Sequence, residues 1–143
     1  MYIHNYLHES LTTSGVVLFG MSMMMMLGNY IGGYLFDRWS PYRTSLIFIA
    51  LSTVSVILMI FFHGWPAFAW LLIPIGLGDG VNLTLTNSYA ATISTRSSRY
   101  IFNVMYIGLN LGVVIGTAMV GYLLKYGMTL LMVVTSGFYI ALL

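Results

Sequence analysis

The residue best placed to do chemistry is Asp79, an acid that lies inside a long apolar segment between Gly78 and Gly80. Asn82 and Thr86 follow three and seven residues later, and this spacing puts the three polar side chains on one face of a helix. A carboxylate within a membrane is costly and is by default a functional residue. The trio is predicted to bind a proton or a cationic substrate. The alternative is a structural carboxyl group that hydrogen-bonds to another helix.

A second polar stripe recurs every seven residues at Asn103, Asn110 and Thr117, with Tyr106 close to the first two. These side chains either face a cavity or hydrogen-bond to a neighbouring helix, since hydrogen bonds in membranes are commonly structural. Both alternatives stay open. A similar, weaker pair is formed by Ser22 and Asn29.

No metal, cofactor or catalytic site is predicted. The chain has no cysteine, and His4, His8 and Glu9 are more simply polar residues at a helix end than metal ligands. The methionines between Met21 and Met26 point around the whole circumference of a helix, so they do not converge on one ion. No nucleophile, base and orienting residue can be assembled, so the chain is not expected to be an enzyme.

The composition predicts an all-α integral membrane protein, because 59% of the residues are hydrophobic and 6% are charged. The net charge of +2 comes from few basic residues, so a nucleic-acid partner is not expected. The charges divide the chain into five apolar segments, of which the last stops short of a full span. They are predicted to be transmembrane helices over residues 14–36, 44–62, 65–93, 100–124 and 128–143.

The loops between these segments predict the orientation of the chain in the cell membrane. Four arginines lie in two alternate short loops, namely Arg38, Arg43, Arg96 and Arg99. Because positively charged loops stay on the inner side, loops 37–43 and 94–99 are predicted to be cytoplasmic in a multi-pass protein. Residues 1–13 would then begin outside without a signal peptide, which indicates a preceding helix that this sequence lacks.

Repeated glycines predict where helices approach each other closely, because small residues on one helix face let two backbones come together. They are Gly28 and Gly32 in the first segment and Gly108, Gly112, Gly116 and Gly121 in the fourth. In the third segment, Pro74 precedes three further glycines, so that helix is expected to bend there.

The segment from Gly33 to Arg43 resembles the signature loop between the second and third helices of major facilitator superfamily transporters. Gly33, Asp37 and Arg38 match that pattern in place. Ser40 replaces its second glycine, and Arg43 supplies a basic residue slightly late. In the family this loop is similar to a latch that stabilises one conformation. Asp37 is expected to pair with an arginine or to cap a helix.

The resemblance implies that the five segments are helices two to six of a twelve-helix bundle, preceded by the outer end of helix one and its loop. The chain would be a partial N-terminal domain. Its fourth segment also resembles the antiporter motif of the drug/proton antiporter-type members at Gly112, Gly116 and Gly121. Thr117 and Val120 depart from that motif.

The function implied by this resemblance is secondary transport of a small molecule by alternating access, with proton-coupled efflux as one form. Asp79 would lie beside the central cavity. The expected partners are the lipid bilayer, a small-molecule substrate, a proton, and the missing C-terminal half or a partner copy. The alternative is a small multi-helix membrane scaffold or assembly subunit without transport activity, which should tolerate asparagine at Asp37 and Asp79.

Overall fold

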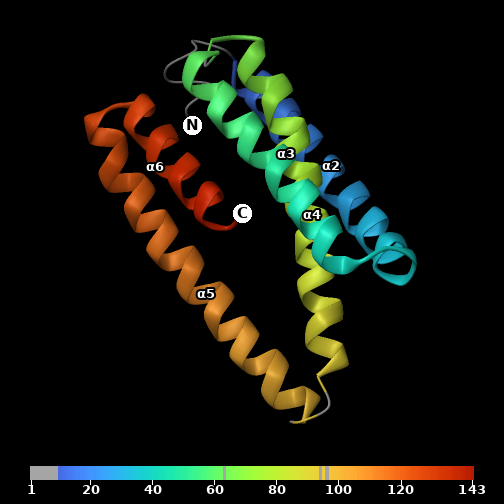
Figure 1. Ribbon diagram of the computed structural model, residues 1–143. Helices are drawn as coiled ribbons and strands as arrows, with labels where there is room; N and C mark the ends of the chain where they lie inside the picture. The colour runs from blue at the N-terminus through green and yellow to red at the C-terminus, as the bar shows by residue number, and fades with distance from the viewer. Residues whose placement is uncertain (1–9, 63, 94, 96) are drawn as a thin grey trace.

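The computed structural model describes residues 10–62, 64–93, 95 and 97–143, and every regular element in these ranges is helical (Figure 1). The helices are α2 (Leu11–Arg38), α3 (Pro41–Phe61), α4 (Ala67–Thr92), α5 (Ser98–Leu123), the short 3-10 helix η1 (Leu124–Tyr126) and α6 (Met128–Ala141). The helices α2 to α5 are long and apolar enough to cross a membrane, whereas α6 has only 14 residues. The described chain is therefore an all-α assembly of membrane-spanning helices.

Local sequence signals explain where the helices begin. The Ser10 side chain accepts a hydrogen bond from the Thr13 amide at 3.0 Å, so α2 starts at Leu11 rather than at residue 14. Ser40 and Pro41 start α3 three residues before the predicted position, because proline is favourable in the first helical turn. At the start of α6, Gly127 adopts a φ of 110°, which favours glycine and lets the chain reverse after η1.

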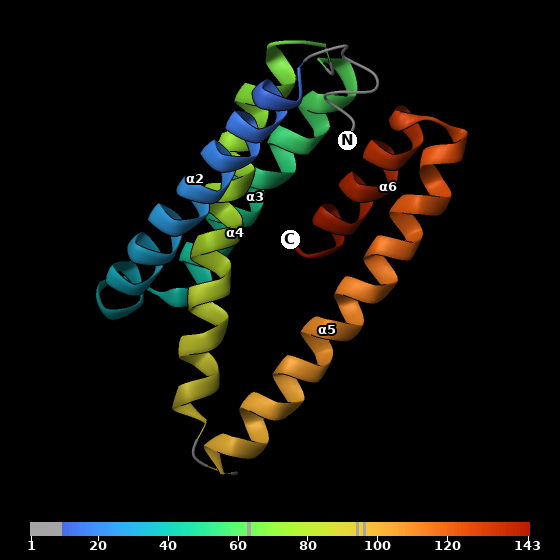
Figure 2. The same cartoon turned by 180° about the vertical axis from the view of Figure 1, so that it is seen from behind.

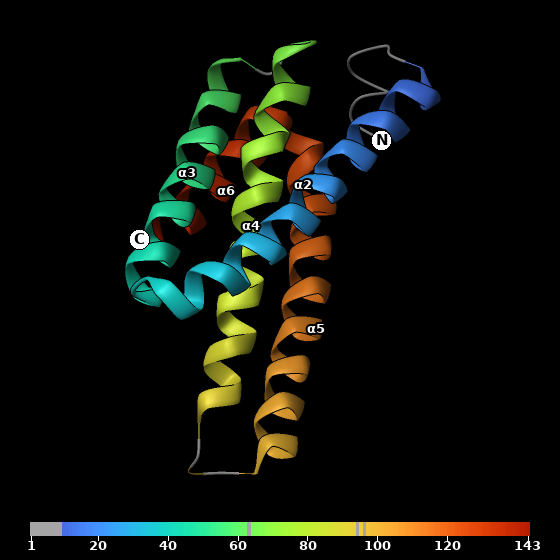
Figure 3. The same ribbon diagram turned by 90° about the vertical axis from the view of Figure 1, so that its right-hand side faces the viewer.

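Helices α2 and α4 run in the same direction and cross each other closely (Figure 3). Glycines from both helices make this approach possible. A Cβ atom on Gly32 would lie 2.9 Å from the Val81 carbonyl oxygen, and one on Gly76 would lie 2.6 Å from the Met21 carbonyl oxygen. Gly28 and Gly80 lie equally tightly against the opposite backbone. Each helix thus presents small residues to the other, as close helix packing in membranes requires.

Helix α3 packs between α4 and α6 and forms the apolar core with them. The core cluster consists of Val56, Met59, Phe68, Ile75 and Met132. Ser52 of α3 lies directly against Gly78 of α4, where any side chain would overlap with its hydroxyl group. The three glycines that follow Pro74 therefore serve helix packing on both sides of α4, and α4 continues through the proline.

Helix α5 diverges from the α2–α4 group along most of its length, as the view from behind shows (Figure 2). It contacts the end of α4 near their connecting loop and contacts α6 toward its other end. It has no buried residue in the described chain. A Cβ atom on each of its four predicted packing glycines would meet nothing within 4 Å, at Gly108, Gly112, Gly116 and Gly121. The close approach predicted for them is not made among the described residues. Only Gly116 faces another described helix, and a cavity of about 100 Å³ separates it from α6. That these four glycines pack against a helix which the described chain does not contain stays a prediction.

Candidate functional site

Asp79 lies in α4 and is half-buried against α6. Its Oδ1 atom accepts a hydrogen bond from the Tyr139 hydroxyl at 3.0 Å. Tyr139 was not predicted as a site residue, although its distance from the start of its helix indicates that it lies at the same level in the membrane as Asp79. It comes 11 residues after the start of α6, and Asp79 comes 12 residues after the start of α4, so both lie about 17 to 18 Å along their helices. Both helices begin on the same side, which brings the two side chains to one level.

Asn82 contacts a different helix from Asp79. Its Oδ1 atom accepts a hydrogen bond from the Ser45 hydroxyl of α3 at 2.6 Å, and its amide donates to the Gly78 carbonyl at 2.9 Å. Three residues of helix leave the two side chains about 60° apart around the axis, since one turn takes 3.6 residues. Asp79 therefore reaches α6 while Asn82 reaches α3.

Thr86 is exposed, and its hydroxyl donates to the Asn82 carbonyl of its own helix at 2.8 Å. No hydrogen bond between side chains joins Asp79, Asn82 and Thr86 in the described chain. The predicted three-residue site is thus divided. Asp79 accepts a hydrogen bond from α6 and Asn82 accepts one from α3, so the two side chains do not converge on one site.

A second polar contact joins α2 to α4 and was only partly expected. The Thr84 hydroxyl lies 3.0 Å from the Asn29 side-chain oxygen and 3.2 Å from its carbonyl oxygen. The sequence had paired Asn29 with Ser22, but the Ser22 hydroxyl donates to the Leu18 carbonyl within α2. The partner of Asn29 lies 55 residues away in sequence, so no local spacing could reveal it.

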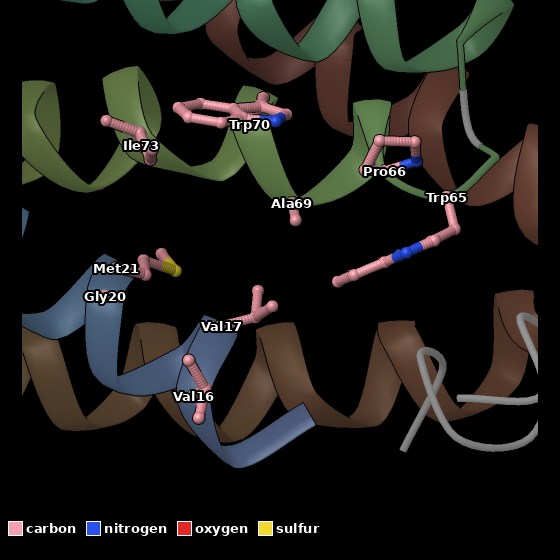
Figure 4. A pocket seen from close by; sticks show the side chains of 9 residues that line it. All are labelled: Val16, Val17, Gly20, Met21, Trp65, Pro66, Ala69, Trp70 and Ile73. Atoms are coloured by element: carbon pink, nitrogen blue, oxygen red, sulfur yellow. The ribbon is translucent and has the colours of Figure 1, made fainter. Parts of the chain in front are cut away.

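Two apolar cavities flank α4 near its first turns. One, of about 210 Å³, lies between α3, α4 and α6, and Tyr139 forms part of its wall together with Met59, Phe68 and Met132. The other, of about 320 Å³, lies between α2 and α4, where Val17 and Met21 face Trp65 and Ala69 (Figure 4). Neither is lined by a charged residue. Asp79 thus lies beyond the Tyr139 end of an apolar cavity rather than in its wall.

The predicted signature loop forms the connection between α2 and α3. The Arg38 guanidinium lies over the Tyr34 ring at 4.6 Å from its centroid. Asp37 is exposed, and among the described residues its carboxylate makes no ion pair or hydrogen bond, so neither the expected arginine pair nor the expected cap is formed there. Arg43 lies on the first turn of α3 beside Trp39 and Ser40.

The polar stripe of α5 is fully accessible in the described chain. Asn103, Tyr106, Asn110 and Thr117 are all exposed. The Asn110 amide donates to the Tyr106 carbonyl at 2.8 Å, and the Thr117 hydroxyl donates to the Val113 carbonyl at 2.7 Å. These bonds stay within α5, so the stripe does not join it to another described helix. The residues considered as metal ligands, His4, His8 and Glu9, lie outside the described residues.

The comparison with known proteins agrees with the all-helical, membrane-spanning character of the chain. Residues 1–143 match the family described as the Major Facilitator Superfamily, and the chain belongs to this family of membrane transporters, which are not enzymes. The chain is 33% identical over 140 residues to an uncharacterized MFS-type transporter, YttB, of Bacillus subtilis (strain 168). The match covers 98% of this chain and 35% of that relative, so the chain spans about a third of the relative's length. No solved structure matches the chain.

Proposed function

We propose that this chain forms part of the N-terminal helix bundle of a secondary transporter that moves a small molecule by alternating access, and that Asp79 binds the coupling proton or a cationic substrate. The observation that carries the proposal is the hydrogen bond from Tyr139 to Asp79 between α6 and α4. This contact involves an ionisable side chain in the apolar part of the helix bundle. Ionisable residues at such positions commonly mark ion and substrate pathways.

The chemistry of this pair suits reversible binding. Tyr139 donates one hydrogen bond and leaves the other lone pairs of the Asp79 carboxylate free to accept a proton or a cation. A bound proton or cation would change the strength of the Tyr139 bond, because hydrogen bonds to an ionised acceptor are roughly twice as strong as neutral ones. The occupancy of Asp79 would thereby alter how firmly α6 is attached to α4.

The substrate site as a whole needs more than this chain. Transporters built from repeats place the substrate between two bundles that rock against each other. Two observations support the proposal that a second helix bundle completes the site: the glycine face of α5 is open, and the chain covers 35% of the Bacillus subtilis relative. That bundle would be either a C-terminal half or another copy of the chain. In this arrangement the 37–43 and 94–99 loops are cytoplasmic, and the 37–43 loop acts as a conformational latch.

The test is a chimera in which this chain replaces the matching segment of the Bacillus subtilis transporter. Proton movement across inverted vesicles is followed with a pH-sensitive dye while a panel of small cations is added. We expect at least one cation to move protons through the chimera and none to do so through the chain alone in liposomes. Saturable transport by the chain alone would contradict the shared-site proposal.

The alternative function is a membrane scaffold, and the tight glycine crossing of α2 with α4 is the observation that favours it. A scaffold would need the glycines but not the Asp79 carboxylate. A chimera that assembles normally yet moves no cation, with or without Asp79→Asn, would support the scaffold. Thr86→Val serves as the matched control in both cases, because its exposed hydroxyl bonds only within α4.

A further inference from the structure

One face of α3 carries an unbroken apolar row that starts at a cation. From Arg43 the row continues at intervals of four, four, three and four residues, which is the repeat of a single helix face, through Ile47, Leu51, Val54 and Leu58. The apolar members of this row are between 38% and 55% exposed. No other described helix covers them, so the face is free along most of the length of α3.

A cavity of about 350 Å³ lies at the charged end of this row and is lined by Trp39, Ser40, Arg43 and Ile47. Arg43 is exposed, and the Ser40 side chain makes no capping hydrogen bond. No acidic residue lines the cavity. A cation, a hydroxyl group and an indole ring therefore surround a space that opens directly onto the apolar row.

The position of this cavity corresponds to the lipid headgroup level. Helix α3 has 21 residues and is therefore about 31 Å long, close to the thickness of the hydrocarbon core. Arg43 is its third residue, so the guanidinium lies near one boundary of the membrane. Trp39 lies just outside the same end, and tryptophan is enriched at this interface.

We propose that this face of α3 binds one phospholipid with an anionic headgroup, whose phosphate contacts Arg43 and Ser40 and whose acyl chain follows the apolar row. Charge complementarity favours the anionic headgroup, since an arginine near the membrane surface attracts anionic lipids. The row favours a lipid over a soluble anion. From Arg43 to Leu58 it extends about 22 Å along the helix, which an acyl chain can cover and a small soluble anion cannot.

The experiment uses the full chain in lipid nanodiscs with Trp39 as the only tryptophan, after Trp65→Phe and Trp70→Phe. These two residues line the cavity between α2 and α4, and both come after the end of α3, whereas Trp39 precedes its start. Quenching of Trp39 fluorescence is compared for brominated phosphatidylglycerol and brominated phosphatidylcholine at the same mole fraction. The contribution of a single arginine predicts an apparent preference of about fivefold for phosphatidylglycerol. Equal quenching by the two lipids would overturn the site.

Two variants and one competitor make the test specific. Arg43→Gln should abolish the preference and Arg43→Lys should keep most of it, while Arg99→Gln, at the start of α5, should leave it unchanged. Circular dichroism checks that each variant retains its helices. A preference that survives Arg43→Gln would contradict the assignment to Arg43. Loss of the preference on adding millimolar inorganic phosphate would also overturn the proposal, because it would assign the cavity to a soluble anion.

Discussion

At the scale of single residues, the contact between Asp79 and Tyr139 is the feature on which the account of function depends. The sequence identified the acid from its depth in an apolar segment, whereas its partner lies 60 residues away in another helix. The same is true of Asn82, whose partner Ser45 was not singled out. A sequence shows which buried groups need a hydrogen-bond partner, but only the packing of helices shows which partner they find.

Removing the Tyr139 hydroxyl should lower the free energy of unfolding, and the size of this loss should depend on whether Asp79 is present. Tyr139→Phe keeps the ring in the wall of the cavity but deletes the donor, so we expect a loss of about 0.5 to 1.5 kcal/mol in unfolding free energy in detergent. Asp79→Ala, which removes the acceptor, should cost much less in the Tyr139→Phe background than in the original chain. Tyr106→Phe is the control, since that side chain is exposed on α5. Fully additive effects of the two substitutions would contradict the contact.

Removal of the Ser52 hydroxyl is expected to change the free energy of unfolding in the opposite direction from removal of the Tyr139 hydroxyl. Its hydroxyl is buried and has no hydrogen-bond partner among the described residues, and a buried unsatisfied polar group costs about 1 to 3 kcal/mol. Ser52→Ala should therefore leave the unfolding free energy unchanged or raise it by up to about 1 kcal/mol. Ser45→Ala should lower it, because that hydroxyl is bonded to Asn82. Equal losses for both variants in the same unfolding assay would show that Ser52 has a partner.

At the scale of helices, the sequence predicted five apolar segments because charge and hydropathy are local properties. The structure places a helix in each segment. The starts of α2 and α3 differ from the predicted ones by three residues, because Ser10 and Ser40 occupy the N-cap positions and Pro41 is the first residue of α3. The pairing of helices was less predictable. Glycines at a four-residue spacing occur both in α5 and at the crossing of α2 with α4. In the described chain only the second set makes the tight approach, through Gly28 and Gly32 of α2 and Gly76 and Gly80 of α4. Spacing shows that a face can pack, not which helix packs on it.

The glycine crossing predicts a clear difference between two alanine substitutions. Gly32→Ala places a Cβ atom 2.9 Å from the Val81 carbonyl oxygen, so the backbones must move apart at a cost of about 1 to 3 kcal/mol. Gly112→Ala meets nothing within 4 Å and should be neutral or slightly stabilising, because alanine favours the helix. Unfolding by denaturing detergent measures both. A larger loss at Gly112 than at Gly32 would contradict the observed packing.

At the scale of the whole molecule, the chain belongs to the Major Facilitator Superfamily and spans about a third of the length of YttB. The chain supplies a compact group of α2, α3, α4 and α6 and an exposed α5. The distribution of arginines predicts an orientation for this group, which labelling can test. Because the chain has no cysteine, single cysteines at Ser40 and Thr95 should resist an impermeant thiol reagent in intact cells, and those at Gly64 and Lys125 should react. The reverse pattern would invert the topology.

The most direct measurement of the central claim compares two modes of transport in the chimera with the Bacillus subtilis relative. Gradient-driven accumulation and gradient-free exchange of the same cation are recorded for the parent, for Asp79→Asn and for Thr86→Val. If Asp79 binds the coupling proton, Asp79→Asn should lose driven accumulation, whereas Thr86→Val should resemble the parent. If Asp79 binds the cation itself, Asp79→Asn should lose both modes. Unchanged driven accumulation in Asp79→Asn would contradict the account and would leave the Tyr139 contact as a structural bond between helices.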